Sequence, residues 1–139
     1  MVFYVQLNNN NIVFASSQLK GKVDNPKMIE LTEEGSDLLG KKYNNGAFHG
    51  LNIASLKSKI IANEETTLTL KWLDMEDNLV DDKTEITIFI NEEEKTKVTA
   101  ENGIAEVGFS SEEIGMFEIV AVCADGCSAG TQIEVIENE

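Results

Sequence analysis

An acidic loop in the middle of the chain carries the residue pattern closest to a metal site. Six residues fall on the positions that ligate calcium in an EF-hand loop: Asp74, Glu76, Asn78, Val80, Asp82 and Glu85. Position 6 is Leu79, where the motif requires glycine, and the flanking segments have the pattern of strands where the motif requires helices. We interpret the segment as a solvated loop between strands, with a calcium site of another type, shared between loops, as the alternative.

Two cysteines flank a short turn near the C-terminal end of the sequence. Cys123 and Cys127 enclose Ala124-Asp125-Gly126, and a disulfide across this turn is feasible if the two Cβ atoms approach to about 3.8 Å. In the cytosol the thiols are expected to stay reduced. The spacing matches neither a zinc site nor the C-x-x-C redox motif. Free thiols and a disulfide both stay open, and the disulfide matters only outside the cell.

The other nucleophiles and bases form no catalytic constellation. His49, the only histidine, follows a predicted hairpin, and we expect a solvent-exposed linker residue. No serine stands in a nucleophile elbow, and no glycine-rich phosphate loop is present. We therefore expect that the protein is not an enzyme, that it has no catalytic residues and that it uses no cofactor.

The charge of the chain is strongly acidic and unevenly distributed. The 25 acidic residues face 11 basic ones, all lysine, for a net charge of -14. Residues 1–50 hold five lysines and five acids, whereas residues 51–139 hold six lysines and twenty acids. Because nucleic-acid binding depends on basic residues that neutralise phosphates, we expect no nucleic-acid partner. The pattern indicates two units, residues 1–50 and 51–139.

The first unit has the pattern of a small hairpin-based module with one short helix. Strand-forming runs at residues 2–7 and 11–15 are separated by asparagines, which favour a tight turn. Residues 28–31 predict a third strand, and Thr32 is placed to cap a helix over residues 33–39. Asn45-Gly46 between two aromatic residues predicts a closing hairpin.

The second unit has the pattern of an antiparallel β-sandwich. Apolar and polar residues alternate along several of its runs, and turn residues separate these runs. Trp72, in one of them, is expected to anchor the core. The predicted strands are residues 59–62, 66–73, 85–90, 94–99, 104–109, 116–123 and 131–136, with residues 50–58 as the joint to the first unit. The predicted fold class is therefore mainly β.

The order of motifs in residues 55–137 resembles the bacterial immunoglobulin-like domains of invasin/intimin type. Asn102-Gly103-Ile104-Ala105-Glu106-Val107-Gly108-Phe109 is similar to the family's D-G-x-A-x-V-x-F strand, and residues 115–121 are similar to its G-x-Y-x-I-x-A strand. Asn102 stands where Asp is usual, and Phe117 stands where Tyr is usual. The resemblance implies an immunoglobulin-like sandwich without a tyrosine corner.

Residues 4–48 resemble a small module of tail-associated proteins from bacteriophages and prophages of Gram-positive bacteria. The matching segments are residues 4–13, 19–23, 28–31 and 38–48, which ends on the aromatic-Gly-aromatic signature. The resemblance implies a structural or accessory component of a tail-type particle that acts by protein–protein or surface adhesion. Its partners would be other tail proteins or a host surface component, and self-association stays open.

Two other functions stay open beside the tail assignment. One is a surface module that binds calcium or carbohydrate, and the other is a small intracellular prophage protein of different function. The N-terminal residues lack the pattern of a secretory signal, and no run approaches the ~20 apolar residues of a membrane span. We expect synthesis in the cytoplasm, no membrane insertion, and later association with a virion or tail particle.

Overall fold

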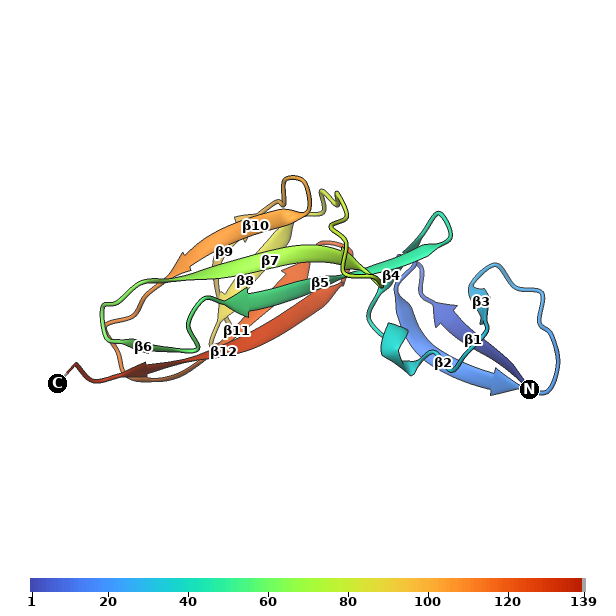
Figure 1. Ribbon diagram of the computed structural model, residues 1–139, viewed down its shortest axis with the longest axis horizontal. Coiled ribbons are helices and arrows are strands. Elements are labelled where there is room, and N and C mark those ends of the chain that lie inside the picture. Colours follow the sequence, from blue (N-terminus) through green and yellow to red (C-terminus); the bar gives the residue numbers. More distant parts are fainter. Residues whose placement is uncertain (139) are drawn as a thin grey trace.

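The computed structural model describes residues 1–138 and shows an elongated, mainly β molecule (Figure 1). A small sheet forms one end, next to the N-terminus, and a two-sheet sandwich forms the rest. The last strand, β12, points toward the end farthest from the N-terminus. The predicted fold class is confirmed.

The N-terminal sheet has the strand order β2-β1-β3. The strands are β1 (Val2–Leu7), β2 (Val13–Leu19) and β3 (Met28–Leu31), and both pairings are antiparallel. Asn11, at the turn between β1 and β2, adopts a left-handed conformation with φ of 62°, which asparagine tolerates well. The inward residues Val5, Leu7 and Val13 form a small separate core with Leu38.

The helix of this unit is shorter than the sequence predicts. It is a 3-10 helix over Ser36–Leu38, not a helix over residues 33–39, and the Thr32 cap is wrong. The N-cap residue is Gly35, which provides no side-chain cap. The carboxylate of Glu34, one residue earlier, accepts hydrogen bonds from the Ser36 backbone N–H at 2.9 Å and the Ser36 hydroxyl at 2.7 Å. Gly35 packs so close to Leu31 and Val5 that a Cβ there would clash.

The chain passes from the small sheet into the sandwich through one hairpin. Its strands are β4 (Lys42–Asn44) and β5 (Ala47–Ser55), and Asn45 and Gly46 turn between them with φ of 51° and 82°. The predicted Asn-Gly turn is confirmed. However, β5 continues as a full strand, paired with β7 from His49 to Ser55. The predicted joint at residues 50–58 is therefore wrong for residues 50–55, and the expected boundary between residues 50 and 51 falls inside β5.

The sandwich consists of two sheets, with strand orders β10-β7-β5-β4 and β6-β12-β11-β8-β9. All pairings are antiparallel except the short parallel pair of β6 with β12. The seven strands predicted by alternation are all present, with small shifts at their ends. They are β6 (Lys59–Ile61), β7 (Thr66–Asp74), β8 (Ile86–Ile90), β9 (Glu93–Val98), β10 (Ile104–Phe109), β11 (Gly115–Cys123) and β12 (Ser128–Ile136).

The main core lies between these two sheets. On β7 the residues Leu68, Leu70 and Trp72 are fully buried, as the alternation predicts, and Trp72 is confirmed as a core residue. Ile12, from the turn of the first unit, also belongs to this core. The N-terminal unit therefore contacts the core of the sandwich through Ile12, a residue that precedes β4 in the chain.

Candidate functional site

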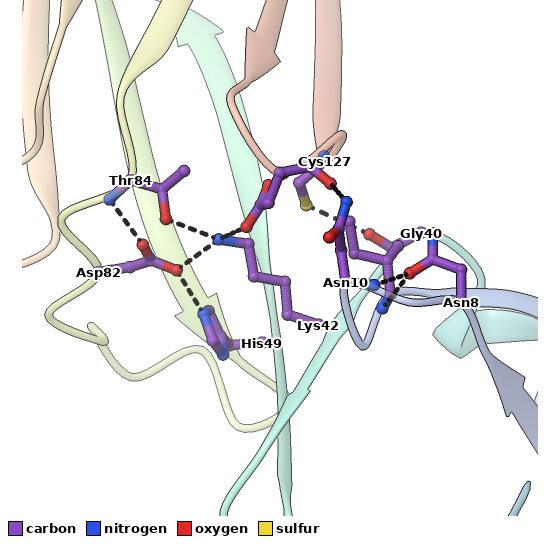
Figure 2. Close-up of polar contacts among 10 residues, drawn as sticks. Asn8, Asn10, Gly40, Lys42, His49, Asp82, Thr84 and Cys127 are labelled. Atoms are coloured by element: carbon purple, nitrogen blue, oxygen red, sulfur yellow. Dashed lines mark hydrogen bonds and ion pairs between the residues drawn. The ribbon is translucent and has the colours of Figure 1, made fainter. Parts of the chain in front are cut away.

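Two of the three buried polar residues within residues 1–138, Lys42 and His49, lie where the N-terminal unit meets the sandwich (Figure 2). The third, Thr66, lies at the start of β7. Lys42 comes from β4 at the edge of its sheet, and its side chain is only 9% exposed. Its ammonium donates to Asp82 Oδ2 at 2.8 Å and to Thr84 Oγ1 at 3.0 Å. It also contacts the carboxylate of Asp125, in the turn between β11 and β12. One lysine thus joins three segments that are distant in sequence.

The carboxylate of Asp82 is fixed by three hydrogen bonds. Besides Lys42, it contacts His49 Nε2 at 2.8 Å and accepts the backbone N–H of Thr84 at 2.9 Å on its other oxygen. Burial by itself would raise the pKa of Asp82, but the hydrogen bonds from His49, Lys42 and Thr84 outweigh it and hold the pKa well below its ordinary range. Asp82 is therefore a tightly held anion.

Lys42 is correspondingly held as a cation. Burial acts to lower the pKa of its ammonium, but the hydrogen bonds to Asp125 and Asp82 prevail and raise the pKa above the ordinary value. The Nζ atom lies 4.3 Å from the centroid of the Trp72 ring, which adds a cation–π attraction. The charge is thus balanced on two sides by carboxylates and on a third by an aromatic face.

His49 packs into the same cluster, against Trp72. It lies on β5 and is 7% exposed, with its ring edge-on to Trp72 at a centroid distance of 5.6 Å. The expectation of a solvent-exposed linker histidine is wrong. The physical reason is that β5 begins two residues earlier and runs straight into the sandwich sheet, so that residue 49 faces inward toward Asp82.

The β11–β12 turn contacts the N-terminal unit at several points. The Asn10 side-chain amide donates to the backbone carbonyl of Asp125 at 2.8 Å, and the Cys127 thiol donates to the carbonyl of Gly40 at 3.3 Å. Cys123 and Cys127 are both buried and both are free thiols. The hydrogen bond between them raises the pKa of Cys123 and lowers that of Cys127. The turn therefore docks the first unit on the end of the sandwich.

A cleft of about 340 Å³ opens beside the Lys42 cluster. Its walls come from the N-terminal turn, the β4–β5 hairpin and the loop before β8. They are mostly polar: Asn10, Asn11, Lys42, Tyr43, Asn44, His49, Val80, Asp81, Asp82, Lys83 and Thr84. The asparagines and Tyr43 offer hydrogen-bonding groups and an aromatic edge to a small polar ligand.

The structure does not bring the calcium candidates together. Asp74 accepts the backbone N–H groups of Glu76 and Asn78, each at 2.9 Å, and so closes its own turn. Asp82 is paired with Lys42 and His49, while Glu85 lies near Lys97 on the sheet surface. Across residues 1–138, no group of three or more His, Cys, Asp or Glu side chains is arranged to hold a metal ion.

Lys42 and Asp125 are the residues of the site that the sequence did not single out. Lys42 stands in Lys41-Lys42-Tyr43, which resembles any solvated basic pair, and Asp125 stands in an ordinary turn. Alternation gives no signal here, because β4 has only three residues and Asn44, on the same face as Lys42, is exposed. Only the three-dimensional pairing with Asp82 and Asp125 makes the role of Lys42 visible.

Solved structures of three proteins share this fold. A CARDB domain from Pyrococcus furiosus matches with a TM-score of 0.51 at 13% identity, covering 65% of this chain and 95% of that one. Part of a polysaccharide lyase matches with a TM-score of 0.53 at 13% identity, covering 64% and 12%. Part of a β-glycosidase from Bacteroides vulgatus matches with a TM-score of 0.52 at 12% identity, covering 96% and 21%.

These similarities establish an immunoglobulin-like β fold. The chain spans about a fifth or less of the length of the two enzymes that it matches. No family model matches the sequence, and a search of curated proteins finds no match. Within residues 1–138, no helix is long and apolar enough to cross a membrane.

Proposed function

We propose that the protein is a noncatalytic structural module of a phage or prophage tail-type particle, which acts by protein–protein or surface adhesion. The observation that carries this proposal is that the buried charged residues connect the two units. Lys42, Asp82 and His49 contact one another and link the two units. These buried charged side chains thereby hold the two units together.

The shape of the molecule suits a rigid connecting part. The N-terminal sheet and the sandwich lie end to end (Figure 1) and share hydrogen bonds, ion pairs and the Ile12 core contact. The first unit is electrically neutral, whereas the second carries the whole net charge of -14. A neutral end that docks on a particle and an acidic end that projects from it is the arrangement we propose.

The tail assignment itself rests on the sequence resemblance of residues 4–48 and on the immunoglobulin-like fold. That fold also occurs as a part of much larger proteins, as the lyase and the glycosidase illustrate. Both points support a module that works within a larger assembly. The particle as its location remains our proposal.

Fractionation of an induced lysate of the source strain tests this proposal. We expect the protein in sedimenting tail-like particles after gradient purification, detected by mass spectrometry and retained after a salt wash. A cytosolic marker protein of similar size controls for trapping. Recovery of the protein only in the soluble fraction would refute the particle assignment and favour the intracellular alternative.

Carbohydrate binding is the second candidate function, because of the polar cleft beside the Lys42 cluster. Asn10, Asn44 and Tyr43 are groups of the kind that bind sugar hydroxyls and sugar ring faces, and they line one opening. Calorimetric titration with soluble surface polysaccharide tests it. Saturable heat that is lost in Tyr43→Ala but kept in Tyr4→Phe would favour this function, whereas absence of heat at high polysaccharide concentration would exclude it for that ligand.

A further inference from the structure

We propose that Lys42 and Asp125 condense to form an intramolecular isopeptide bond. The amine of Lys42 and the carboxylate of Asp125 are in direct contact, and a second carboxylate, Asp82, lies 2.8 Å from the same nitrogen. A primary amine, a carboxyl carbon and a carboxylate that can carry protons are the three groups that amide formation needs. The inference concerns the chemistry of this cluster and stands independently of the particle assignment.

The reacting groups are largely buried, although a polar cleft opens beside them. The Lys42 side chain is 9% exposed and that of Asp82 is 11% exposed, while Asp125 reaches the site from the edge with 23% of its side chain exposed. The Trp72 ring, 4.3 Å from Nζ, closes one side. The starting state is the ion pair, because against the effect of burial the two carboxylates raise the pKa of Lys42, so the transfer of its proton to Asp125 is the costly step. The water that is released can escape through the exposed side of Asp125.

The backbone holds the reacting groups in place. Lys42 is on β4, whose partner β5 is a central strand, and its neighbour Lys41 hydrogen-bonds to Val13 through the backbone. Asp125 is in the three-residue turn of the β11–β12 hairpin, closed by the Cys123 N–H to Cys127 carbonyl bond at 2.7 Å. Groups fixed in this way react as if at an effective concentration of about 10⁵–10⁸ M, which offsets the unfavourable equilibrium of amide formation in water.

The reaction balances without an external reagent. A proton first moves from the Lys42 ammonium to the Asp125 carboxylate with which it is in contact, which gives a neutral amine and a carboxylic acid. The Nζ lone pair then attacks Cγ of Asp125 and forms the C–N bond. Once the Lys42 amine is neutral, it no longer lowers the pKa of Asp82 as a cation. Asp82 then takes a proton from the nitrogen and returns it to the departing hydroxyl, so that one water molecule leaves and Asp82 is again a carboxylate. The products are one amide and one water.

Asp82 has the position of the proton carrier, whereas Asp125 has that of the electrophile. Asp82 is held on both oxygens, by Thr84 on one and by His49 and Lys42 on the other, so that attack on its carbon would disrupt three contacts. Asp125 has a more open side chain at the end of a turn. The bond would link β4 covalently to the last hairpin and so tie the junction of the two units to the end of the sandwich.

Mass spectrometry of the full-length protein tests the proposal. We expect the folded wild-type protein to be lighter than its sequence by one water molecule, and a tryptic digest to contain one branched peptide that joins Lys42 to Asp125. Lys42→Arg is the matched control, because arginine keeps the positive charge and the ion pairs but does not form this amide. It should show its full sequence mass.

A folded wild-type protein with its full sequence mass would overturn the proposal, and so would a branch at Asp82. A water can also be lost by succinimide formation at Asp125-Gly126; that loss would persist in Lys42→Arg and leave no branched peptide, and it would equally count against the bond. The Asp82→Asn variant tests the proton carrier. We expect the dehydrated fraction to fall at least tenfold at equal incubation time, whereas an unchanged fraction in a cooperatively folding variant would exclude this role of Asp82.

Discussion

At the scale of single residues, Asp82 shows how this protein stabilises a buried negative charge. Its carboxylate is buried, yet it accepts hydrogen bonds from Lys42, His49 and Thr84, which keep its pKa well below the ordinary range. An unpaired buried carboxylate would be neutralised instead. The charge is therefore stable only because three elements converge on it.

This pairing predicts a pH dependence of stability. The pKa of Asp82 is lower in the folded than in the unfolded chain. The ionised carboxylate therefore contributes its full share to the free energy of unfolding above the unfolded pKa of about 3.9. This contribution is lost as pH falls below that value toward the folded pKa. We expect the difference in free energy of unfolding between wild type and Asp82→Asn to shrink as pH falls from 5 to 2. Urea unfolding at each pH measures this difference. A difference that stays constant over this range would contradict the lowered pKa.

The sequence reveals the chemical type of these residues but not which side chains they contact. The sequence pattern indicates a solvated loop residue or a calcium ligand at Asp82 and an exposed linker residue at His49, because a carboxylate in an acidic loop and a lone histidine after a hairpin are usually solvated. Their burial results from the pairing of β5 with β7 and from the docking of Lys42, which are contacts between distant segments. Local patterns carry no information about such contacts.

At the scale of elements, alternation and turn residues predict most of the architecture. The seven sandwich strands, the Asn45-Gly46 turn and the β3 strand are found where the sequence indicates them. Strand β9 lies at a sheet edge, where the acidic run at residues 92–94 deters pairing with another chain. Strand β5 was missed because Gly50 and Asn52 interrupt its apolar residues, although Leu51 and Ile53 do alternate.

The turn before β10 yields a test of how elements fit together. Gly103 has φ of +86°, and a Cβ on it would lie 2.9 Å from the backbone carbonyl of Val80, on the segment that leads to Asp82. We expect Gly103→Ala to lose clearly more stability than the about 1–2 kcal/mol that the left-handed conformation costs by itself. Gly46→Ala is the matched control, since Gly46 has φ of +82° with open space around it. Equal losses in urea unfolding would show that the close approach to Val80 is unimportant.

At the scale of the whole molecule, a neutral unit and an acidic unit are joined at a buried ionic cluster. The junction combines the Ile12 contact, the Asn10 and Cys127 hydrogen bonds and the three-way pairing of Lys42. We infer that the two units unfold together, since Asp82 and Asp125 both hold Lys42 across the junction. A rigid two-part body is what the proposed structural role requires.

Scanning calorimetry of the full chain, with Lys42→Met as the variant, tests this claim most directly. Methionine keeps the apolar stem but removes the amine, so that neither the ion pairs nor the proposed amide can form. Loss of one partner from a buried pair alone costs about 3–5 kcal/mol. We predict one transition for the wild type, with equal calorimetric and van't Hoff enthalpies, and a much lower or divided transition for Lys42→Met. Lys83→Met, which removes only the exposed pair with Asp81, should remain close to wild type. Two independent wild-type transitions, or a Lys42→Met melt indistinguishable from that of Lys83→Met, would contradict the account.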